Sequence, residues 1–181
     1  MKEIVQEGTK VLREMAKPVP EEMFGTPELA SIIDDMKKAL DPELEGVALA
    51  APQIGVPYRI FIVRRDRTVP TPPMTEQGST LAQNSQGRTL PAQNDVYINP
   101  EIVKTSHRRV LMDEGCLSTR GIYGTTLRHE RATLRARNFD GNKFERGAGG
   151  LLAQIFQHET DHLNGTLFID HAEHLVEIQH E

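Results

Sequence analysis

The chain has 181 residues, which is enough for one domain with its own hydrophobic core. Its 21 basic and 26 acidic side chains give a net charge of −5, which argues against a surface that binds nucleic acid directly. No apolar run is long enough to cross a membrane, the N-terminus lacks the apolar core of a signal peptide, and a single cysteine fits a reducing compartment. We therefore expect residues 1–181 to form one domain that acts as a monomer in the cytoplasm.

The first third of the chain predicts scaffold elements. Residues 9–16 predict a short helical turn that two prolines end. A Thr-Pro pair followed by apolar residues at helical spacing predicts an amphipathic helix over 27–40, packed on the outside of the core. Small residues dominate 46–55, where another backbone can approach closely, and β-branched and aromatic residues predict a strand over 58–63.

Residues 64–95 differ from the rest of the chain. They are rich in polar residues, proline and glycine, and they show little periodicity. This composition is typical of a long polar insertion that can be disordered in part, and we expect no chemistry in it.

The second half predicts strands and then a helix. The strands are expected over 96–104 (broken at Asn99-Pro100), 109–112, 126–139 and, after an Asp-Gly turn, 143–146. Glycines at 147–150 predict a loop before the helix, and residues 171–181 form a short polar tail. This order predicts an α+β fold with antiparallel sheets around a central C-terminal helix.

That helix carries His158-Glu159-Thr160-Asp161-His162. Histidines four residues apart lie on one helical face, so both imidazoles can bind one metal ion. Glu159 lies beside the first ligand, where a carboxylate can take a proton from metal-bound water. If the two histidines were ordinary surface residues, their face of the helix would be polar. Ile155 and other apolar residues lie on that face instead. The pattern therefore predicts a catalytic metal site.

A catalytic metal site usually has three protein ligands, so a third ligand is needed. In the longer zinc-protease pattern it would lie at position 168, but Phe168 cannot ligate. Glu173 and Glu177 are downstream candidates. Cys116 lies upstream in a Glu-Gly-Cys-Leu-Ser segment, although a lone cysteine is more often a small buried core residue.

Three motifs in order carry a resemblance to a known family. Residues 46–53 (GVALAAPQ), 114–118 (EGCLS) and 157–162 (QHETDH) resemble the G-x-G-L-A-A-x-Q, E-G-C-L-S and Q-H-E-x-D-H motifs of peptide deformylases. The similarity runs from about residue 12 to residue 170 and is interrupted by 64–95. It implies removal of the formyl group from formylmethionine at the N-terminus of nascent proteins, so N-formylmethionyl peptides are the expected partners.

The resemblance also implies a metal centre and a mechanism. The implied ligands are Cys116, His158 and His162. They would hold one divalent ion, natively Fe²⁺, with Zn²⁺, Ni²⁺ or Co²⁺ able to replace it. Metal-bound water would attack the formyl carbon and Glu159 would act as general base and acid. The Gln53 side chain and the Leu117 N–H would stabilise the oxyanion.

For the substrate, the resemblance implies that the peptide backbone pairs with Val47, Ala48 and Gly115. The methionine side chain would enter an apolar pocket near Ile155. The tail is acidic and short, so we expect only transient proximity to the ribosome, without a basic docking helix. No membrane contact is expected.

Two departures from the family pattern stand out. Ala48 replaces a usual glycine, which would narrow the cleft or constrain the backbone. After the EGCLS motif, Thr119-Arg120-Gly121 stand where family members more often have valine and proline. Glu114 is either a solvated charge or part of an ion pair, and Asp161 is expected to support the site rather than to catalyse. The alternative functions are a metallo-amidase or peptidase of other specificity, or an inactive metal-binding paralogue.

Overall fold

The structure, a computed structural model, describes residues 2–68 and 93–178. The α-helices are α1 (Pro27–Leu40), α2 (Arg65–Thr68) and α3 (Gly150–Leu163), and 3-10 helices occupy Lys10–Arg13, Glu21–Met23, Ala51–Ile54 and Phe168–Asp170. The strands are β1 (Ala48–Ala50), β2 (Ile60–Arg64), β3 (Asn94–Thr105), β4 (Arg109–Gly115), β5 (Ile122–His129), β6 (Arg131–Arg137), β7 (Lys143–Gly149) and β8 (Glu173–Glu177).

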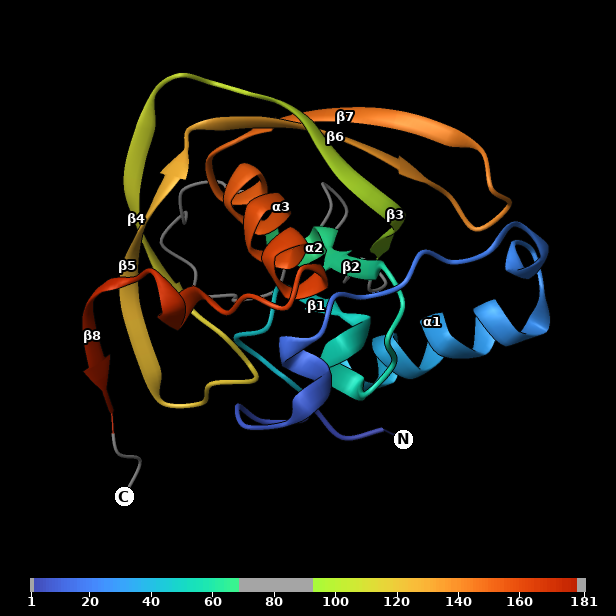
Figure 1. Ribbon diagram of the computed structural model, residues 1–181, viewed down its shortest axis with the longest axis horizontal. Helices are drawn as coiled ribbons and strands as arrows, with labels where there is room; N and C mark the ends of the chain where they lie inside the picture. The colour runs from blue at the N-terminus through green and yellow to red at the C-terminus, as the bar shows by residue number, and fades with distance from the viewer. Residues whose placement is uncertain (1, 69–92, 179–181) are drawn as a thin grey trace, which may run out of the picture.

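Two antiparallel sheets surround α3, as Figure 1 shows. The larger sheet has five strands in the order β1-β2-β3-β6-β7, and the smaller has three in the order β4-β5-β8. Helix α3 packs against the larger sheet and also contacts β5, while α1 contacts β1 and β2. The predicted α+β fold, with antiparallel sheets around the C-terminal helix, is confirmed.

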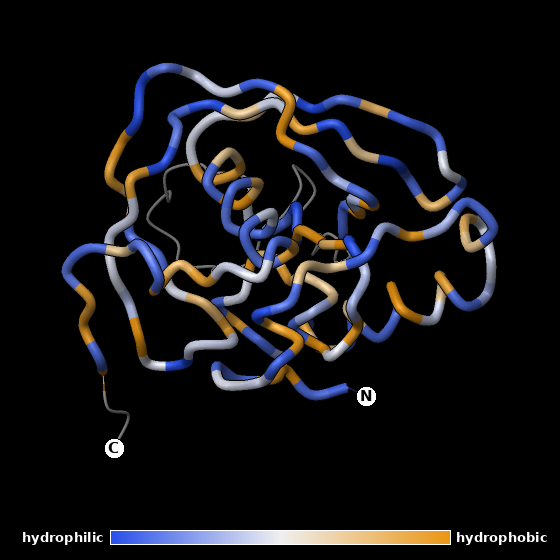
Figure 2. Tube along the Cα trace, in the orientation of Figure 1, coloured by the Kyte–Doolittle hydropathy of each residue, from blue (hydrophilic) through white to orange (hydrophobic). Residues whose placement is uncertain are grey.

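Strand β2 forms the centre of the core because it is buried on both faces. Ile60 and Ile62 belong to the cluster that includes α1, whereas Phe61 and Val63 belong to the cluster that includes α3. Successive side chains of a strand point to opposite faces, so this alternation places the two helices on opposite sides of the sheet. Figure 2 shows apolar residues along β2 near the centre of the molecule, and apolar residues alternating with polar ones along α1.

The predicted helix over 27–40 is confirmed at both ends. The Thr26 hydroxyl accepts a hydrogen bond from the Leu29 N–H (3.3 Å), and a proline follows at the first helical position. The turn predicted over 9–16 is shorter, at Lys10–Arg13, and the predicted strand over 58–63 starts two residues later. Within the described ranges, none of the helices combines the length and apolar character that crossing a membrane requires.

The prediction of a single strand over 126–139 is wrong. The chain forms β5 and β6, which belong to different sheets and are separated at Glu130. The Glu130 N–H donates to the Arg108 carbonyl, which holds the chain at this bend. Alternation of side chains continues through the bend, and neither glycine nor proline marks it, so the sequence pattern shows one strand where two exist.

Two further expectations about the C-terminal part are wrong. The glycines at 147–150 do not form a loop, because β7 extends to Gly149 and α3 begins at Gly150. The tail contains β8, which pairs with β5 although all five of its residues are exposed. A strand held by backbone hydrogen bonds alone needs no apolar side chains and leaves little sequence signal.

The polar insertion and the broken strand also differ from expectation. Residues 65–68 form α2, and β3 already begins at Asn94, so both ends of the expected 64–95 loop have regular structure. The remainder, residues 69–92, lies outside the described residues. Strand β3 is not broken at Asn99 but is bulged there, with a register shift between Ile98 and Glu101.

We expect Phe61→Ala to lower the free energy of unfolding by about 3–5 kcal/mol, because it removes a large side chain from a closed core. Phe61 is fully buried and stacks on Tyr97 with ring centroids 4.8 Å apart. Urea unfolding would measure the loss. Met15→Ala is the control, because Met15 is 72% exposed and should change stability by less than about 0.5 kcal/mol. Equal losses in both variants would contradict this picture of the core.

Candidate active site

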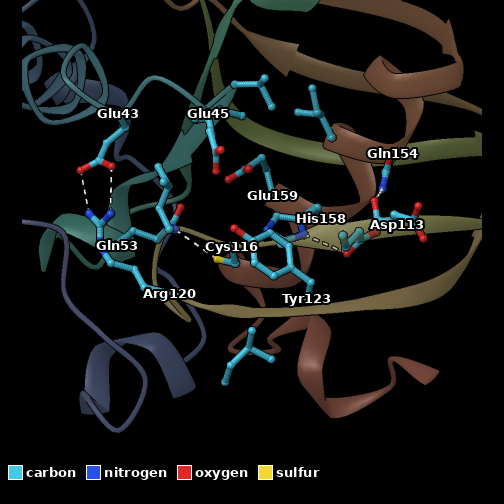
Figure 3. A pocket seen from close by; sticks show the side chains of 18 of the residues that line it. Glu43, Glu45, Gln53, Asp113, Cys116, Arg120, Tyr123, Gln154, His158 and Glu159 are labelled. Atoms are coloured by element: carbon cyan, nitrogen blue, oxygen red, sulfur yellow. Dashed lines mark hydrogen bonds and ion pairs between the residues drawn. The ribbon is translucent and has the colours of Figure 1, made fainter. Parts of the chain in front are cut away.

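Helix α3 and the end of β4 bring three metal-binding side chains together. The possible ligand atoms of Cys116, His158 and His162 all lie within 4.8 Å of one another. The Cys116 Sγ is 3.2 Å from His162 Nε2. The spacing of the two histidines predicted that they share a metal. Cys116 directly follows β4 and lies beside His158 (Figure 3). Glu173 and Glu177, the downstream alternatives, lie exposed on β8 and are not part of this group.

The chemistry of the three donors fits a divalent transition metal. One thiolate and two imidazoles suit Fe²⁺, Zn²⁺, Co²⁺ or Ni²⁺. The Nδ1 of His158 lies 3.0 Å from the Glu114 carboxylate, which leaves Nε2 for a metal. Burial of Cys116 disfavours the thiolate, but the neighbouring His162 and His158 hold the pKa of the thiol well below its usual value. The thiol of the group therefore favours the thiolate form, which is the form that binds a metal.

Glu159 is a buried carboxylate at the floor of the cleft. It is 3% exposed, and its Oε2 has no hydrogen-bond partner among the described residues. Burial raises the pKa of Glu159 to about 7, and the two adjacent histidines oppose this shift. Buried polar atoms are rarely left without a partner, so this oxygen is placed for a group that binds in the cleft.

Gln53 reaches the same site from the 3-10 helix that follows β1. Its Oε1 accepts a hydrogen bond from the Ala50 N–H (2.8 Å), which fixes the amide. Its Nε2 donates to the Ser118 hydroxyl (3.1 Å) and lies 3.5 Å from the Cys116 Sγ. No described backbone carbonyl accepts a hydrogen bond from the Leu117 N–H. The structure thus places both expected oxyanion donors beside the metal-binding group.

Arg128 is a residue of the site that the sequence did not predict. Its guanidinium donates to both oxygens of Glu114 (2.7 and 3.0 Å) and to Asp161 (2.7 Å), and Glu114 in turn contacts His158. Although burial raises the pKa of Glu114, His158 and Arg128 hold it below its usual range. Glu114 is therefore part of a buried ion pair and not a solvated charge. Arg128 lies on the buried face of β5 with Thr126, whereas the apolar Leu127 is exposed, so the polarity of the side chains suggests the opposite orientation.

A cleft of about 710 Å³ opens onto this site. Val47 and Ala48 line one wall, Gly115 lines the opposite wall, and Ile155 lies on the α3 side. Strand β1 is an edge of the larger sheet and β4 is an edge of the smaller, so two strand edges face the cleft. The replacement of the usual glycine by Ala48 causes no backbone strain, because Ala48 does not have a positive φ angle.

The fold and the site together define a metal-dependent hydrolase, with a buried carboxylate beside a cysteine–dihistidine group in a peptide-sized cleft. A family model described as polypeptide deformylase matches residues 1–177. The chain therefore belongs to the peptide deformylase family, whose members remove the N-formyl group from nascent peptides. The resemblance expected from the three motifs is confirmed.

Relatives and solved structures agree with this assignment. The chain is 40% identical over 163 residues to a peptide deformylase of Halothermothrix orenii, covering 90% of this chain and 88% of that one. It is 37% identical over 164 residues to one from Salinibacter ruber, covering 91% and 76%. A Met-Ala-Ser-bound class I type b peptide deformylase from Acinetobacter baumannii has a TM-score of 0.76 at 30% identity, covering 94% and 98%.

We expect Glu114→Gln to weaken metal binding by about 10–100-fold, because an amide no longer holds the His158 imidazole as a carboxylate does. Competition with a chromogenic chelator would measure the change. Glu145→Gln is the matched control, since Glu145 forms an exposed ion pair with Arg135 away from the site. An unchanged metal affinity in Glu114→Gln would show that Glu114 does not orient His158.

Proposed function

We propose that Cys116, His158 and His162 hold the catalytic metal and that Glu159 moves the proton in deformylation. The observation that carries this proposal is the unpartnered Oε2 of Glu159, buried beside the three ligands at the floor of the cleft. Fe²⁺ is the proposed native ion, and Zn²⁺, Ni²⁺ or Co²⁺ would also fit the donor set. When bound, such an ion acts as a Lewis acid and lowers the pKa of a bound water toward neutrality.

Glu159 would act first as base and then as acid. Its carboxylate takes a proton from the attacking water and then delivers it to the nitrogen of the departing amine. A group that performs both steps works best with a pKa near the working pH, and burial raises the pKa of Glu159 to about 7.

The formyl oxygen would be received by two donors. The Gln53 Nε2 is fixed in place because its Oε1 is held by the Ala50 N–H, and the Leu117 N–H has no described backbone acceptor. Fixed donors aimed at a developing negative charge need no rearrangement during the reaction, and one of them is typically worth about 3 kcal/mol. Ser118, which accepts from Gln53, would help to hold this amide.

The peptide would bind as an extra strand between β1 and β4. The Val47 carbonyl accepts a hydrogen bond from the Arg64 N–H (2.8 Å), so alternation turns the backbone groups of Ala48 toward the free edge. Gly115 lies on the facing edge of β4 and offers no side chain that would block the peptide. The methionine side chain would enter beside Ile155. The Acinetobacter baumannii relative binds Met-Ala-Ser, which supports a short peptide as the ligand of this cleft.

We further propose that formylmethionyl peptides meet the enzyme in the cytoplasm, with the chain acting as a monomer. Proximity to the ribosome would be transient, because the C-terminal strand β8 carries acidic rather than basic side chains at both of its ends. The proposal includes no direct contact with nucleic acid or with a membrane.

Glu159→Ala should abolish formate release from formyl-Met-Ala-Ser while the protein keeps one metal ion per chain. The reason is that the variant loses its proton carrier but none of the three ligands. Formate release would be followed with a coupled assay, and the metal would be quantified in the same samples. Glu145→Gln again serves as the control. Full activity in Glu159→Ala would overturn the role of this carboxylate.

The same assay separates deformylation from a broader amidase activity. Acetyl-Met-Ala and an unblocked Met-Ala peptide should not be hydrolysed, because the cleft floor beside Glu159 is buried and a formyl group is the smallest acyl group. Equal turnover of all three peptides would favour a metallo-amidase or peptidase. No turnover by the metal-loaded parent would favour an inactive paralogue.

The iron form should lose activity in aerated buffer, whereas a zinc-loaded form should keep it. Both Fe²⁺ and the Cys116 thiolate can be oxidised, and Zn²⁺ has no redox chemistry. Formate release would be measured over time with and without oxygen. Activity of the protein as purified that persists in aerated buffer without reductant would contradict iron as the native metal.

A further inference from the structure

The loop between α1 and β1 forms one wall of the cleft and leads directly into the peptide-binding edge. Residues 42–46 of this loop line the cleft, and Val47 and Ala48 follow at once. The loop packs weakly, because Leu44 is 89% exposed and Asp41, Pro42 and Glu45 are also exposed. Something other than core packing must therefore fix its conformation.

Two side-chain ion pairs hold this loop, Glu43 with Arg120 and Asp41 with Arg64, and Arg67 on α2 holds its backbone. The Nη1 of Arg67 donates to the carbonyls of Glu43 (2.6 Å) and Gly46 (2.5 Å), and its Nη2 donates to the carbonyl of Asp41 (3.1 Å). Among the described residues Arg67 has no carboxylate within salt-bridge distance, whereas Arg64 pairs with Asp41 and Asp66 and Arg65 pairs with Asp95. Both terminal nitrogens of the Arg67 guanidinium thus donate hydrogen bonds to the backbone of one loop.

Gly46 links the loop to the peptide-binding edge of β1. A Cβ at Gly46 would lie 3.0 Å from the Leu117 side chain and 2.9 Å from that of Leu40, so the backbone here packs directly on both. A shift of the Gly46 carbonyl would therefore move the start of the β1 edge. Packed interiors transmit such shifts because they leave no free volume.

We propose that Arg67 is a positioning residue that holds the peptide-binding edge of the cleft in its binding conformation. The inference rests on the proposed binding of the peptide along β1. Arg67 touches neither the metal ligands nor Glu159, so its effect falls on the affinity for the peptide beyond formylmethionine and not on the chemical step. A guanidinium suits the task because its planar fork can serve several carbonyls at once, whereas an ammonium is a single point of charge.

The test compares Arg67→Ala and Arg67→Lys with the parent enzyme on formyl-Met-Ala-Ser and on formyl-Met amide. For Arg67→Ala we expect KM for the longer peptide to rise about tenfold while kcat stays within about twofold, the pattern of a lost binding interaction. KM for formyl-Met amide should change little, so the preference for the longer substrate falls. The KM of Arg67→Lys for the longer peptide should lie between those of the parent enzyme and Arg67→Ala. Metal content and thermal unfolding are measured on the same samples.

Arg65→Ala is the matched control, because Arg65 lies on the same short helix but pairs with Asp95 and not with the loop. It should behave as the parent does. The proposal is overturned if Arg67→Ala keeps the parent's preference for the longer peptide, if KM rises equally for both substrates, or if kcat or the metal is lost. If Arg67→Ala does not fold, a parental preference in Arg67→Lys overturns it.

Failure of the binding mode itself would look different. A parent enzyme without any preference for the longer peptide would refute binding along β1, whatever Arg67 does. A parent enzyme that shows this preference, together with Arg67 variants that keep it, would refute only the positioning role.

Discussion

The buried carboxylate of Glu114 joins three elements that otherwise belong to different layers of the molecule. It lies on β4, accepts two hydrogen bonds from Arg128 on β5, and contacts His158 on α3. A carboxylate that stays ionised when buried needs partners for its oxygens, so these contacts stabilise one another. Cys116 follows Glu114 by two residues. The contacts that satisfy Glu114 therefore also fix the thiol against the imidazoles of α3, and the geometry of the metal-binding group depends on them.

The features that the sequence predicted well are those with a local physical cause. The helix over 27–40 shows in its cap and in its apolar spacing, both of which act within a few residues. The pair His158 and His162 follows from helical geometry alone, and Glu159 follows from its place between them. Cys116 and Gln53 are different, because neither is near α3 in the sequence. Only the ordered motifs of the family indicate their roles. Without those motifs, Cys116 is one of several candidate metal ligands.

The features that the sequence did not predict depend on contacts between distant segments. Arg128 is one polar residue among several in an alternating strand, and its importance arises only when Glu114 and Asp161 lie beside it. Strand β8 is held by its backbone and leaves its side chains in solvent. Arg67 is similar, since its partners are carbonyl groups, which every residue carries. Backbone partners leave no trace in a pattern of side chains.

The arrangement of the sheets explains why this site would act on chain ends. An unpaired strand edge is a hazard on an exposed surface, because it can pair with another sheet. Here the edges of β1 and β4 face each other across a cleft, where a whole sheet cannot enter but a single extended chain can. Glu159 lies at the floor of that cleft, beneath both edges. A peptide that pairs with the edges must place its terminal acyl group near Glu159. The distance between the edges therefore sets which chains fit, and that distance depends on how firmly the loop before β1 is held.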